Sequence, residues 1–363
     1  MNGISKERYT GCLLGGAAGD ALGWPVEFDS IGEIRSLFGP RGVREMKPGK
    51  GGLYEITDDT QMTLFTAEGL LRAWTRARHS GSVPDFATAL AHSYLDWLAT
   101  QREQPEVPGP EAAGSGWLID VKGLHVRRAP GGTCLSALRA MQSPAQKVAG
   151  NTSKGCGGVM RAAPAGCLAV RINKSDSTGT ALLAFEHGCQ AAALTHGDPS
   201  GHLPAGVLAT VISSVLQGET VEAGITRSLA ILQGRNGSGE MVAALKAALE
   251  LARDPMVTPS PEVVETLGAG WIGTEALAIG LYCALVAGGD FARGIRLAVN
   301  HSGDSDSTGS IAGNILGALL GEQAIPAEWT EKLELAEVVR QVGEDLFTAF
   351  EGTESWFKKY PAR

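Results

Sequence analysis

Two segments of the chain carry a glycine at every fourth position, and this spacing constrains the fold more than any other feature. The eight glycines form one stripe near the start of the chain and one near its end: Gly11, Gly15, Gly19, Gly23 and Gly309, Gly313, Gly317, Gly321. Residues four apart lie on one face of an α-helix. Because a glycine inside a helix costs on the order of 1 kcal/mol relative to alanine, we expect each stripe to lie against another backbone.

Apolar residues recur at helical spacing along most of the chain, beginning with residues 60–78. The same pattern predicts further helices over these ranges: 84–100, 181–194, 203–217, 240–252, 273–287, 290–299 and 331–350. Strand-like alternation is sparse, and proline and glycine predict loops at 101–116, 128–132 and 254–262. Since neither a composition shift nor a solenoid repeat divides the chain, we predict one all-α domain over residues 1–363.

The composition argues against several classes of protein. The net charge of −8 disfavours nonspecific nucleic-acid binding and attachment to an anionic membrane surface. The six cysteines are scattered without a C-x-x-C pair, which is typical of a reduced cytoplasmic protein and not of a zinc ribbon. The short apolar run near the N-terminus is interrupted by Asp20 and so does not indicate a signal peptide. We find no stretch long and apolar enough to span a bilayer.

Two pairs of carboxylates precede apolar helical segments. Asp58 and Asp59 begin one segment, and Asp304 and Asp306 begin the glycine-striped segment near the end of the chain. A single acid at such a place is best read as a helix N-cap. A second carboxylate beside it would repel the first unless a cation lay between them. Carboxylate and hydroxyl oxygens favour Mg²⁺, Mn²⁺ or Ca²⁺ over zinc or copper. An EF-hand loop starting at Asp304 is excluded, because its twelfth position, which must be a glutamate, would be Ile315.

Five stretches of the chain, taken together, resemble the ADP-ribosylglycohydrolase family, which includes dinitrogenase reductase-activating glycohydrolase and the animal ADP-ribosylarginine and ADP-ribosylserine hydrolases. They are "GCLLGGAAGDALGWPVEF", "TDDTQMTL", "SKGCGGVMRAAP", "LTHGDPSG" and "HSGDSDSTGSIAGNILGALLG". The stretches occur in the order found in the family and span residues 11 to 321. The resemblance implies a compact multi-helix orthogonal bundle with a central metal-lined cleft.

The resemblance also implies two divalent cations, Mg²⁺ or Mn²⁺. By motif position, their ligands would be Thr57, Asp58, Asp59, Asp304, Asp306 and Ser307. The family often has threonine where Ser307 stands, and serine keeps the hydroxyl. Asp59 and Glu27 are the candidate catalytic acids and bases, although Glu27 could also be an exposed loop glutamate. Asp20 is expected to support the site without binding metal directly.

The stretch around residue 155 resembles the family's ligand loop. The substrate-binding residues that it implies, with one histidine further along the chain, are Ser153, Gly155, Cys156, Gly157, Gly158 and His196. Backbone N–H groups of such a loop can converge on a phosphate. The alternative for the loop is a plain turn, and the alternative for His196 is a histidine packed in the core. Many family members have asparagine where Cys156 stands. Weaker candidates for the same pocket are Gly131, Gly132, Thr133, His301 and Trp271, the last of which could stack on a base or pack in the core. Met160 and Arg161 are expected to pack.

The expected function is hydrolysis of the glycosidic bond between ADP-ribose and an acceptor, with arginine on a modified protein as the favoured acceptor. Serine linkage, O-acetyl-ADP-ribose, ADP-ribose polymer, other small ADP-ribose conjugates and modified nucleic acid stay open. A module that binds ADP-ribose without cleaving it is the alternative from another class, and a role in reversing a toxin's modification also stays open. The acceptor side is expected to come from loops at 28–56 and 101–132.

Overall fold

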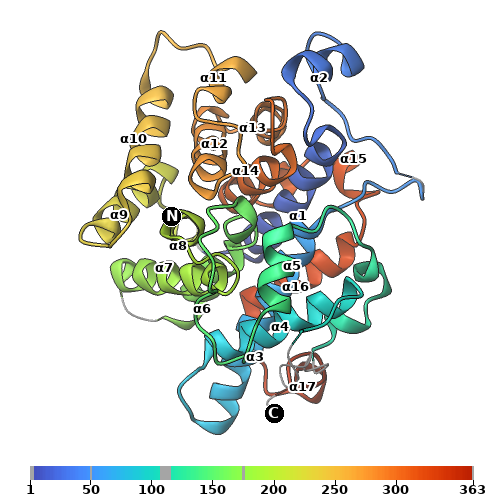
Figure 1. Ribbon diagram of the computed structural model, residues 1–363, viewed down its shortest axis with the longest axis vertical. Coiled ribbons are helices and arrows are strands. Elements are labelled where there is room, and N and C mark those ends of the chain that lie inside the picture. Colours follow the sequence, from blue (N-terminus) through green and yellow to red (C-terminus); the bar gives the residue numbers. More distant parts are fainter. Residues whose placement is uncertain (1–3, 50, 107–115, 174–175, 362–363) are drawn as a thin grey trace.

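The structure is a computed structural model that describes residues 4–49, 51–106, 116–173 and 176–361 (Figure 1). The described residues form α-helices and short 3₁₀ turns and contain no named β-strand; two isolated β-bridges join Tyr54 to Leu333 and Gly155 to Ile272. The prediction of an all-α chain is therefore confirmed.

The helices run through the whole described chain. The α-helices are α1 Lys6–Gly23, α2 Ile31–Phe38, α3 Asp58–Ser80, α4 Phe86–Thr100, α5 Gly132–Arg139, α6 Ala163–Ile172, α7 Ser177–Ala193, α8 Pro199–Leu216, α9 Val221–Leu232, α10 Gly239–Arg253, α11 Pro261–Glu265, α12 Gly273–Val286, α13 Phe291–Ala298, α14 Ser305–Leu320, α15 Ala327–Thr330, α16 Ala336–Thr348 and α17 Glu354–Lys359. The 3₁₀ turns are η1 Trp24–Val26, η2 Leu118–Asp120, η3 Lys122–His125, η4 Cys156–Gly158 and η5 Glu322–Ala324.

Several predicted boundaries differ from the structure; α7 and α8, for example, each begin four residues before the expected start. The helix expected over 331–350 begins only at Ala336, because Leu335 before it has a positive φ of 58°. The loop expected over 28–56 contains α2, whose start is fixed by a capping box between Ser30 and Glu33. Within the loop expected over 101–116, residues 107–115 lie outside the described part of the chain.

Each glycine stripe lies against another helix backbone, as the spacing predicts, and the structure shows that this backbone is the other stripe. α1 and α14 pack side by side and antiparallel near the centre of the molecule (Figure 1). A β-carbon on Gly11 would lie 2.7 Å from the carbonyl oxygen of Gly317, and one on Gly309 would lie 2.5 Å from that of Gly19. Real β-carbons do not approach a backbone this closely. The stripes therefore let two helix backbones touch.

The antiparallel contact brings the end of α1 to the start of α14. Gly23, the last residue of α1, faces Ser305, the first residue of α14. In the last turns of α1, the buried Asp20 carboxylate accepts hydrogen bonds from the N–H groups of Thr57, at 3.0 and 3.1 Å, and Thr60, at 3.2 Å. These bonds hold the start of α3 at the same place. Three helix ends thus meet at one point.

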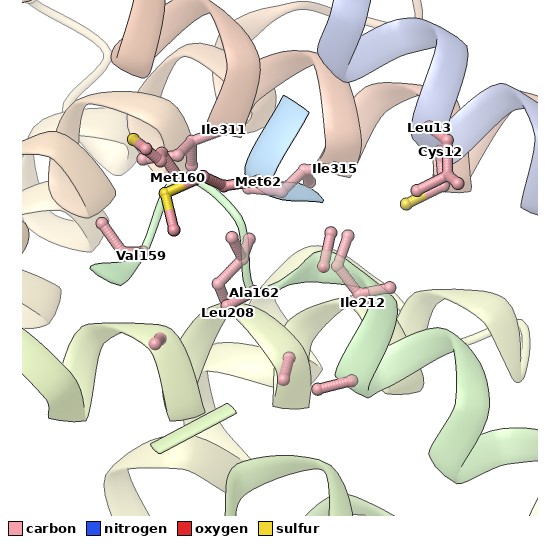
Figure 2. Close-up of a cluster of buried hydrophobic side chains, with 14 of the residues drawn as sticks. Cys12, Leu13, Met62, Val159, Met160, Ala162, Leu208, Ile212, Ile311 and Ile315 are labelled. Carbon is pink, nitrogen blue, oxygen red and sulfur yellow. The ribbon is translucent and has the colours of Figure 1, made fainter. Parts of the chain in front are cut away.

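A continuous hydrophobic core surrounds this meeting point. Figure 2 shows part of it, where Met62 of α3 and Ile311 of α14 lie near Met160. One described helix, α8, is long and apolar enough to cross a bilayer, contrary to the expectation from sequence. Since 89% of it is buried inside the fold, it fits a core helix of this body.

Candidate functional site

A cavity of about 340 Å³ opens where the three helix ends meet. Its walls include these ten residues singled out from the sequence: Glu27, Asp58, Asp59, Gly155, Cys156, Gly157, His196, Asp304, Asp306 and Ser307. Five of the ten are carboxylates, and neither lysine nor arginine lines the cavity among the described residues. Segments up to 280 positions apart in the sequence therefore build one strongly acidic pocket.

Helix starts position four of the five carboxylates. Asp58 and Asp59 are the first two residues of α3, Asp304 is the N-cap of α14 and Asp306 lies in its first turn. The expected capping by an acid is present at α14 only, where Asp304 accepts the N–H of Ser307 at 3.3 Å. The cap of α3 is Thr57, which accepts the N–H of Asp59 at 3.2 Å. Capping therefore does not explain Asp58, Asp59 or Asp306.

The carboxylates lie close together, and two of their oxygens are unsatisfied. One oxygen each from Glu27, Asp304 and Asp306 lies within 4.8 Å of the others. Buried oxygens of Asp59 and Glu27 have no hydrogen-bond partner. Burying an unpaired carboxylate oxygen costs free energy. Such oxygens are the preferred ligands of hard divalent cations. The donor set therefore fits the cations that the sequence implies.

Crowding and burial raise the pKa values of these acids. Desolvation, followed by the neighbouring carboxylates, raises the pKa of Glu27 to about 8. Desolvation raises the pKa of Asp58 to about 7, and burial with nearby acids raises those of Asp59 and Asp306 well above the usual range. The folded protein without cations therefore holds protons that the unfolded chain releases.

This proton binding makes a prediction about stability without divalent cations. Groups with a raised folded pKa stabilise the fold at low pH, and this stability is lost as pH rises through the folded pKa values. We expect the thermal unfolding midpoint in a chelator to fall between about pH 6.5 and pH 9, the window that the Asp58 and Glu27 values set. Below about pH 6.5 two histidines oppose this fall and make it less steep, because burial lowers the pKa of His187 to about 4 and that of His196 to about 3.

Differential scanning fluorimetry in a chelator and in Mg²⁺ or Mn²⁺ measures this effect. The gain in midpoint from the cation should grow with pH across the same window, since bound cations favour ionised ligands. A midpoint in chelator that stays level from pH 6.5 to pH 9 would show that burial and crowding do not raise the pKa values of these carboxylates as described above.

The loop before η4 departs from the interpretation that its amides converge on an anion. The N–H of Gly155 donates to Ser153 Oγ at 3.3 Å, and the N–H of Cys156 donates to the carbonyl of Trp271 at 3.2 Å. Both amides are thus used inside the protein, and the interpretation is wrong for them. Gly158 is a packing glycine, because a β-carbon there would lie 2.6 Å from the carbonyl oxygen of Gly201. Neither Gly158 nor Ser153 lines the cavity.

The start of α5 supplies backbone donors that the sequence indicated only weakly. Gly131, Gly132 and Thr133 all line the cavity, and α5 has no side-chain cap at its N-terminus. Gly131 N–H donates to Asp58 Oδ2 at 3.0 Å. The Thr133 and Ser153 hydroxyls lie 3.1 Å apart, which links this helix start to the glycine loop. An uncapped helix start attracts negatively charged groups.

A buried arginine fixes the remaining wall. Arg161 donates to the carbonyl of Gly157 at 2.8 Å and to Thr195 Oγ1 at 2.6 Å, and its guanidinium lies 4.5 Å from the centre of the Tyr94 ring. Thr195 Oγ1 in turn lies 2.8 Å from Nδ1 of His196. Thr195 Oγ1 accepts from Arg161, and its own proton has two acceptors in reach, His196 Nδ1 at 2.8 Å and the carbonyl of Ala192 at 3.3 Å. Donation along the shorter contact leaves Nε2–H of the neutral imidazole as a donor. Sequence reasoning did not single out Thr195, although it lies in the quoted stretch "LTHGDPSG".

The other predicted residues lie in several places. The side chain of Cys156 contacts Asp304, with its thiol 2.7 Å from Oδ2, and burial raises its pKa. Thr57 lies outside the cavity lining, as the cap described above, and its role as a metal ligand stays a prediction. His301 is a buried residue bonded to Thr308 at 2.9 Å and does not line the cavity. Trp271 lines the cavity and is 39% exposed, so it is not a core residue.

Comparison with known proteins identifies the family. The model of the family described as ADP-ribosylglycohydrolase matches residues 1–355. The chain is similar to ADP-ribosylhydrolase ARH3 of Homo sapiens, with 26% identity over 96% of this chain and 94% of that protein. It is similar to ADP-ribosyl-[dinitrogen reductase] glycohydrolase of Rhodospirillum rubrum, with 26% identity over 94% of this chain and 97% of that protein.

A solved structure gives the same result for the fold. The structure titled ADP-ribosylglycohydrolase-related protein complex aligns with a TM-score of 0.65 and 26% identity, over 95% of this chain and 98% of that chain. Relatives in the family are hydrolases of ADP-ribose glycosidic bonds. The chain, with its acidic cavity at three helix ends, therefore belongs to the ADP-ribosylglycohydrolase family and is a hydrolase of this kind.

Proposed function

We propose that this hydrolase depends on two divalent cations, Mg²⁺ or Mn²⁺, and releases ADP-ribose from the side chain of arginine on modified proteins in the cytoplasm. The observation that carries the proposal is the cluster of five carboxylates in one cavity, with unpaired buried oxygens on Asp59 and Glu27. Among the residues that the structure describes, no lysine or arginine lines the cavity to balance them. A membrane has no part in this function, and nucleic acid enters only as a possible modified substrate.

The residues around the cations would be Thr57, Asp58, Asp59, Asp304, Asp306 and Ser307. When bound, the cations would supply positive charge that orients the hydroxyls of the distal ribose and a water molecule. Glycosidic bonds of ribose break through a transition state with oxocarbenium character. Carboxylates that face the anomeric carbon stabilise that developing positive charge.

Two acids are available for proton transfer. Asp59 is 2% exposed and keeps an unpaired oxygen, so it would accept a proton from the attacking water within the closed part of the cavity. Glu27 is more exposed, follows η1 at the cavity edge and also has an unpaired oxygen. We assign Glu27 to proton transfer on the acceptor side, where the leaving group meets solvent.

The remaining walls would hold the diphosphate. The donors are Nε2–H of His196 and the backbone N–H groups at the start of α5. Binding energy from this part of the substrate would orient the reacting bond at a distance from it. Four glycines line this part of the cavity, and without side chains they leave room for a close approach of the backbone to the ligand: Gly131, Gly132, Gly155 and Gly157.

A substrate panel tests the proposal. Peptides with ADP-ribose on arginine or serine, O-acetyl-ADP-ribose, ADP-ribose polymer and ADP-ribosylated DNA would be incubated with the protein in Mg²⁺, in Mn²⁺ and in chelator, with released ADP-ribose measured by mass spectrometry. We expect cation-dependent release that is fastest from arginine. Preferred release from another substrate would move the acceptor assignment to that linkage. Binding of ADP-ribose without release from any substrate would identify a non-catalytic module.

A further inference from the structure

Two aromatic side chains form an exposed shelf at the cavity. The rings of Phe28 and Trp271 are stacked, with centroids 5.0 Å apart and an angle of 21° between their planes. Both residues line the cavity, and they are 69% and 39% exposed. Large apolar side chains are usually buried, and neither ring belongs to the buried core. A stacked pair that stays open to solvent beside an acidic pocket is a surface for a flat ligand.

The backbone holds Phe28 in an unfavourable conformation to build this shelf. Phe28 has a φ of 75°, in the left-handed region that residues other than glycine rarely adopt. Its N–H donates to the carbonyl of Gly303 at 3.2 Å, which ties it to the residue before Asp304. Strain of this kind persists where the surrounding structure enforces it and is concentrated at functional sites.

Trp271 is held from both directions. Its carbonyl accepts the N–H of Cys156, and the N–H groups of Ala269 and Gly270 before it donate to Glu275 Oε2 at 3.1 and 3.2 Å. The carbonyl of Ala269 accepts the N–H of Asp304 at 2.9 Å. Trp271 is therefore fixed to a segment that is bonded to the carboxylate cluster, as Phe28 is.

The position of the shelf points to the acceptor and not to the adenine of ADP-ribose. Phe28 follows Glu27 directly in the sequence. Trp271 lies two residues after Ala269, whose carbonyl accepts the N–H of Asp304. Both rings therefore lie near the carboxylates at which the bond between ribose and acceptor would break. A group attached to the anomeric carbon would lie against them.

The charges point to a planar cation. Four of the five carboxylates in the cavity are proposed ligands of the divalent cations, which leaves Glu27 as the carboxylate beside the shelf. Lys154 of the glycine loop does not line the cavity and is paired with Glu240 at 2.7 Å. A guanidinium is flat, stacks on aromatic faces and is always charged. A nucleobase would gain the stacking without the charge, and a serine side chain would gain neither.

We infer that Phe28 and Trp271 form the acceptor subsite and select the guanidinium group of arginine by stacking, beside the carboxylate of Glu27. This inference rests on the proposed hydrolysis. It makes the two aromatic side chains determinants of specificity for the acceptor, with no role in binding the ADP-ribose part of the substrate.

Three variants test the inference: Phe28→Ala, the conservative Phe28→Tyr and the control Leu37→Ala. Leu37 is 68% exposed, nearly as much as Phe28, and does not line the cavity. In Phe28→Ala we expect the ratio of kcat/KM for arginine-linked over serine-linked ADP-ribose to fall about tenfold. Phe28→Tyr should recover most of the ratio, and Leu37→Ala should keep it. The affinity for free ADP-ribose, measured by isothermal titration calorimetry with Mg²⁺, should change by less than about twofold in Phe28→Ala.

Other results would overturn the inference. Weaker binding of ADP-ribose in Phe28→Ala would assign the shelf to adenine. An equal loss of kcat/KM for a neutral substrate with ADP-ribose on a nucleobase would assign the shelf to nucleobases. An unchanged ratio of kcat/KM for the arginine-linked and serine-linked substrates would leave the shelf without a role in the choice of acceptor.

Binding of agmatine separates this inference from the proposed function. Agmatine carries a guanidinium without ADP-ribose, and its titration into the Mg²⁺-loaded protein with saturating ADP-ribose needs no turnover. If no substrate is hydrolysed, binding of agmatine that weakens about tenfold in Phe28→Ala would still support the subsite. Absence of such binding in the unchanged protein would refute it.

Discussion

Gly313→Ala is expected to destabilise the protein, although alanine is the better helix former. Gly313 lies inside α14, and a β-carbon there would lie 2.5 Å from the carbonyl carbon of Gly15 in α1. The backbone of α1 cannot move aside as a flexible side chain could. Propensity alone would gain about 1 kcal/mol, but overpacking in a close-packed core costs about 1–3 kcal/mol and more where backbone must shift. We expect a net loss of about 2 kcal/mol for alanine and more than about 4 kcal/mol for Gly313→Leu.

Urea and thermal unfolding measure this loss, and Gly239→Ala is the matched control. Gly239 begins α10, and beyond its own helix and chain neighbours no atom lies within 4 Å of the position of its β-carbon. The same substitution there should leave stability unchanged or raise it by up to about 1 kcal/mol. If Gly313→Ala unfolds at the same midpoint as the unchanged protein, the two backbones do not pack as closely as the structure has them.

The glycine stripes show how much of the fold follows from local sequence. Their spacing predicts two helices with a bare face, and the helical periodicity predicts α3, α4, α7, α8, α10, α12 and α13. The spacing of the glycines does not identify the backbone that each stripe contacts. That choice depends on the whole antiparallel pair, in which Gly19 meets Gly309 and Gly11 meets Gly317.

Part of the candidate site was likewise predictable from local sequence, and part depends on the whole fold. The acids at the starts of α3 and α14 were predictable, because two adjacent carboxylates at a helix start need a partner. A supporting part for Asp20 was expected, but its partners were not, since it accepts hydrogen bonds from backbone N–H groups at the start of another helix. The shelf was not predictable either: Phe28 and Trp271 are 243 positions apart in the sequence, and only the fold stacks them.

The glycine loop shows where motif reasoning fails. Glycines allow N–H groups to converge on a ligand, but they also allow close packing and hydrogen bonds within the protein. The sequence alone does not separate these uses. In the fold, neighbouring segments of the protein occupy both positions. Gly158 packs against the backbone of Gly201, and the N–H of Cys156 donates to the carbonyl of Trp271.

The double variant Asp304→Asn/Asp306→Asn is expected to fold and to lose hydrolysis by about 10³-fold or more. Asn is as good an N-cap as Asp, so the start of α14 keeps the bond that Asp304 accepts from Ser307 N–H. The change replaces two ionisable carboxylates in a cluster of five with neutral amides. It also relieves repulsion, since Asp304 and Asp59 are among the causes that raise the pKa of Asp306. Activity and stability in chelator should therefore change in opposite directions.

The readouts are release of ADP-ribose, calorimetric titration of Mn²⁺ and the thermal midpoint in chelator at pH 8. We expect weaker Mn²⁺ binding together with a midpoint equal to or above that of the unchanged protein. Asp290→Asn is the control, because Asp290 caps α13 by accepting the N–H of Arg293 at 3.0 Å and does not line the cavity. It should keep the activity and the Mn²⁺ affinity. A double variant that hydrolyses at the normal rate would remove Asp304 and Asp306 from the metal site, whereas one that loses activity and also unfolds in chelator would make them structural caps.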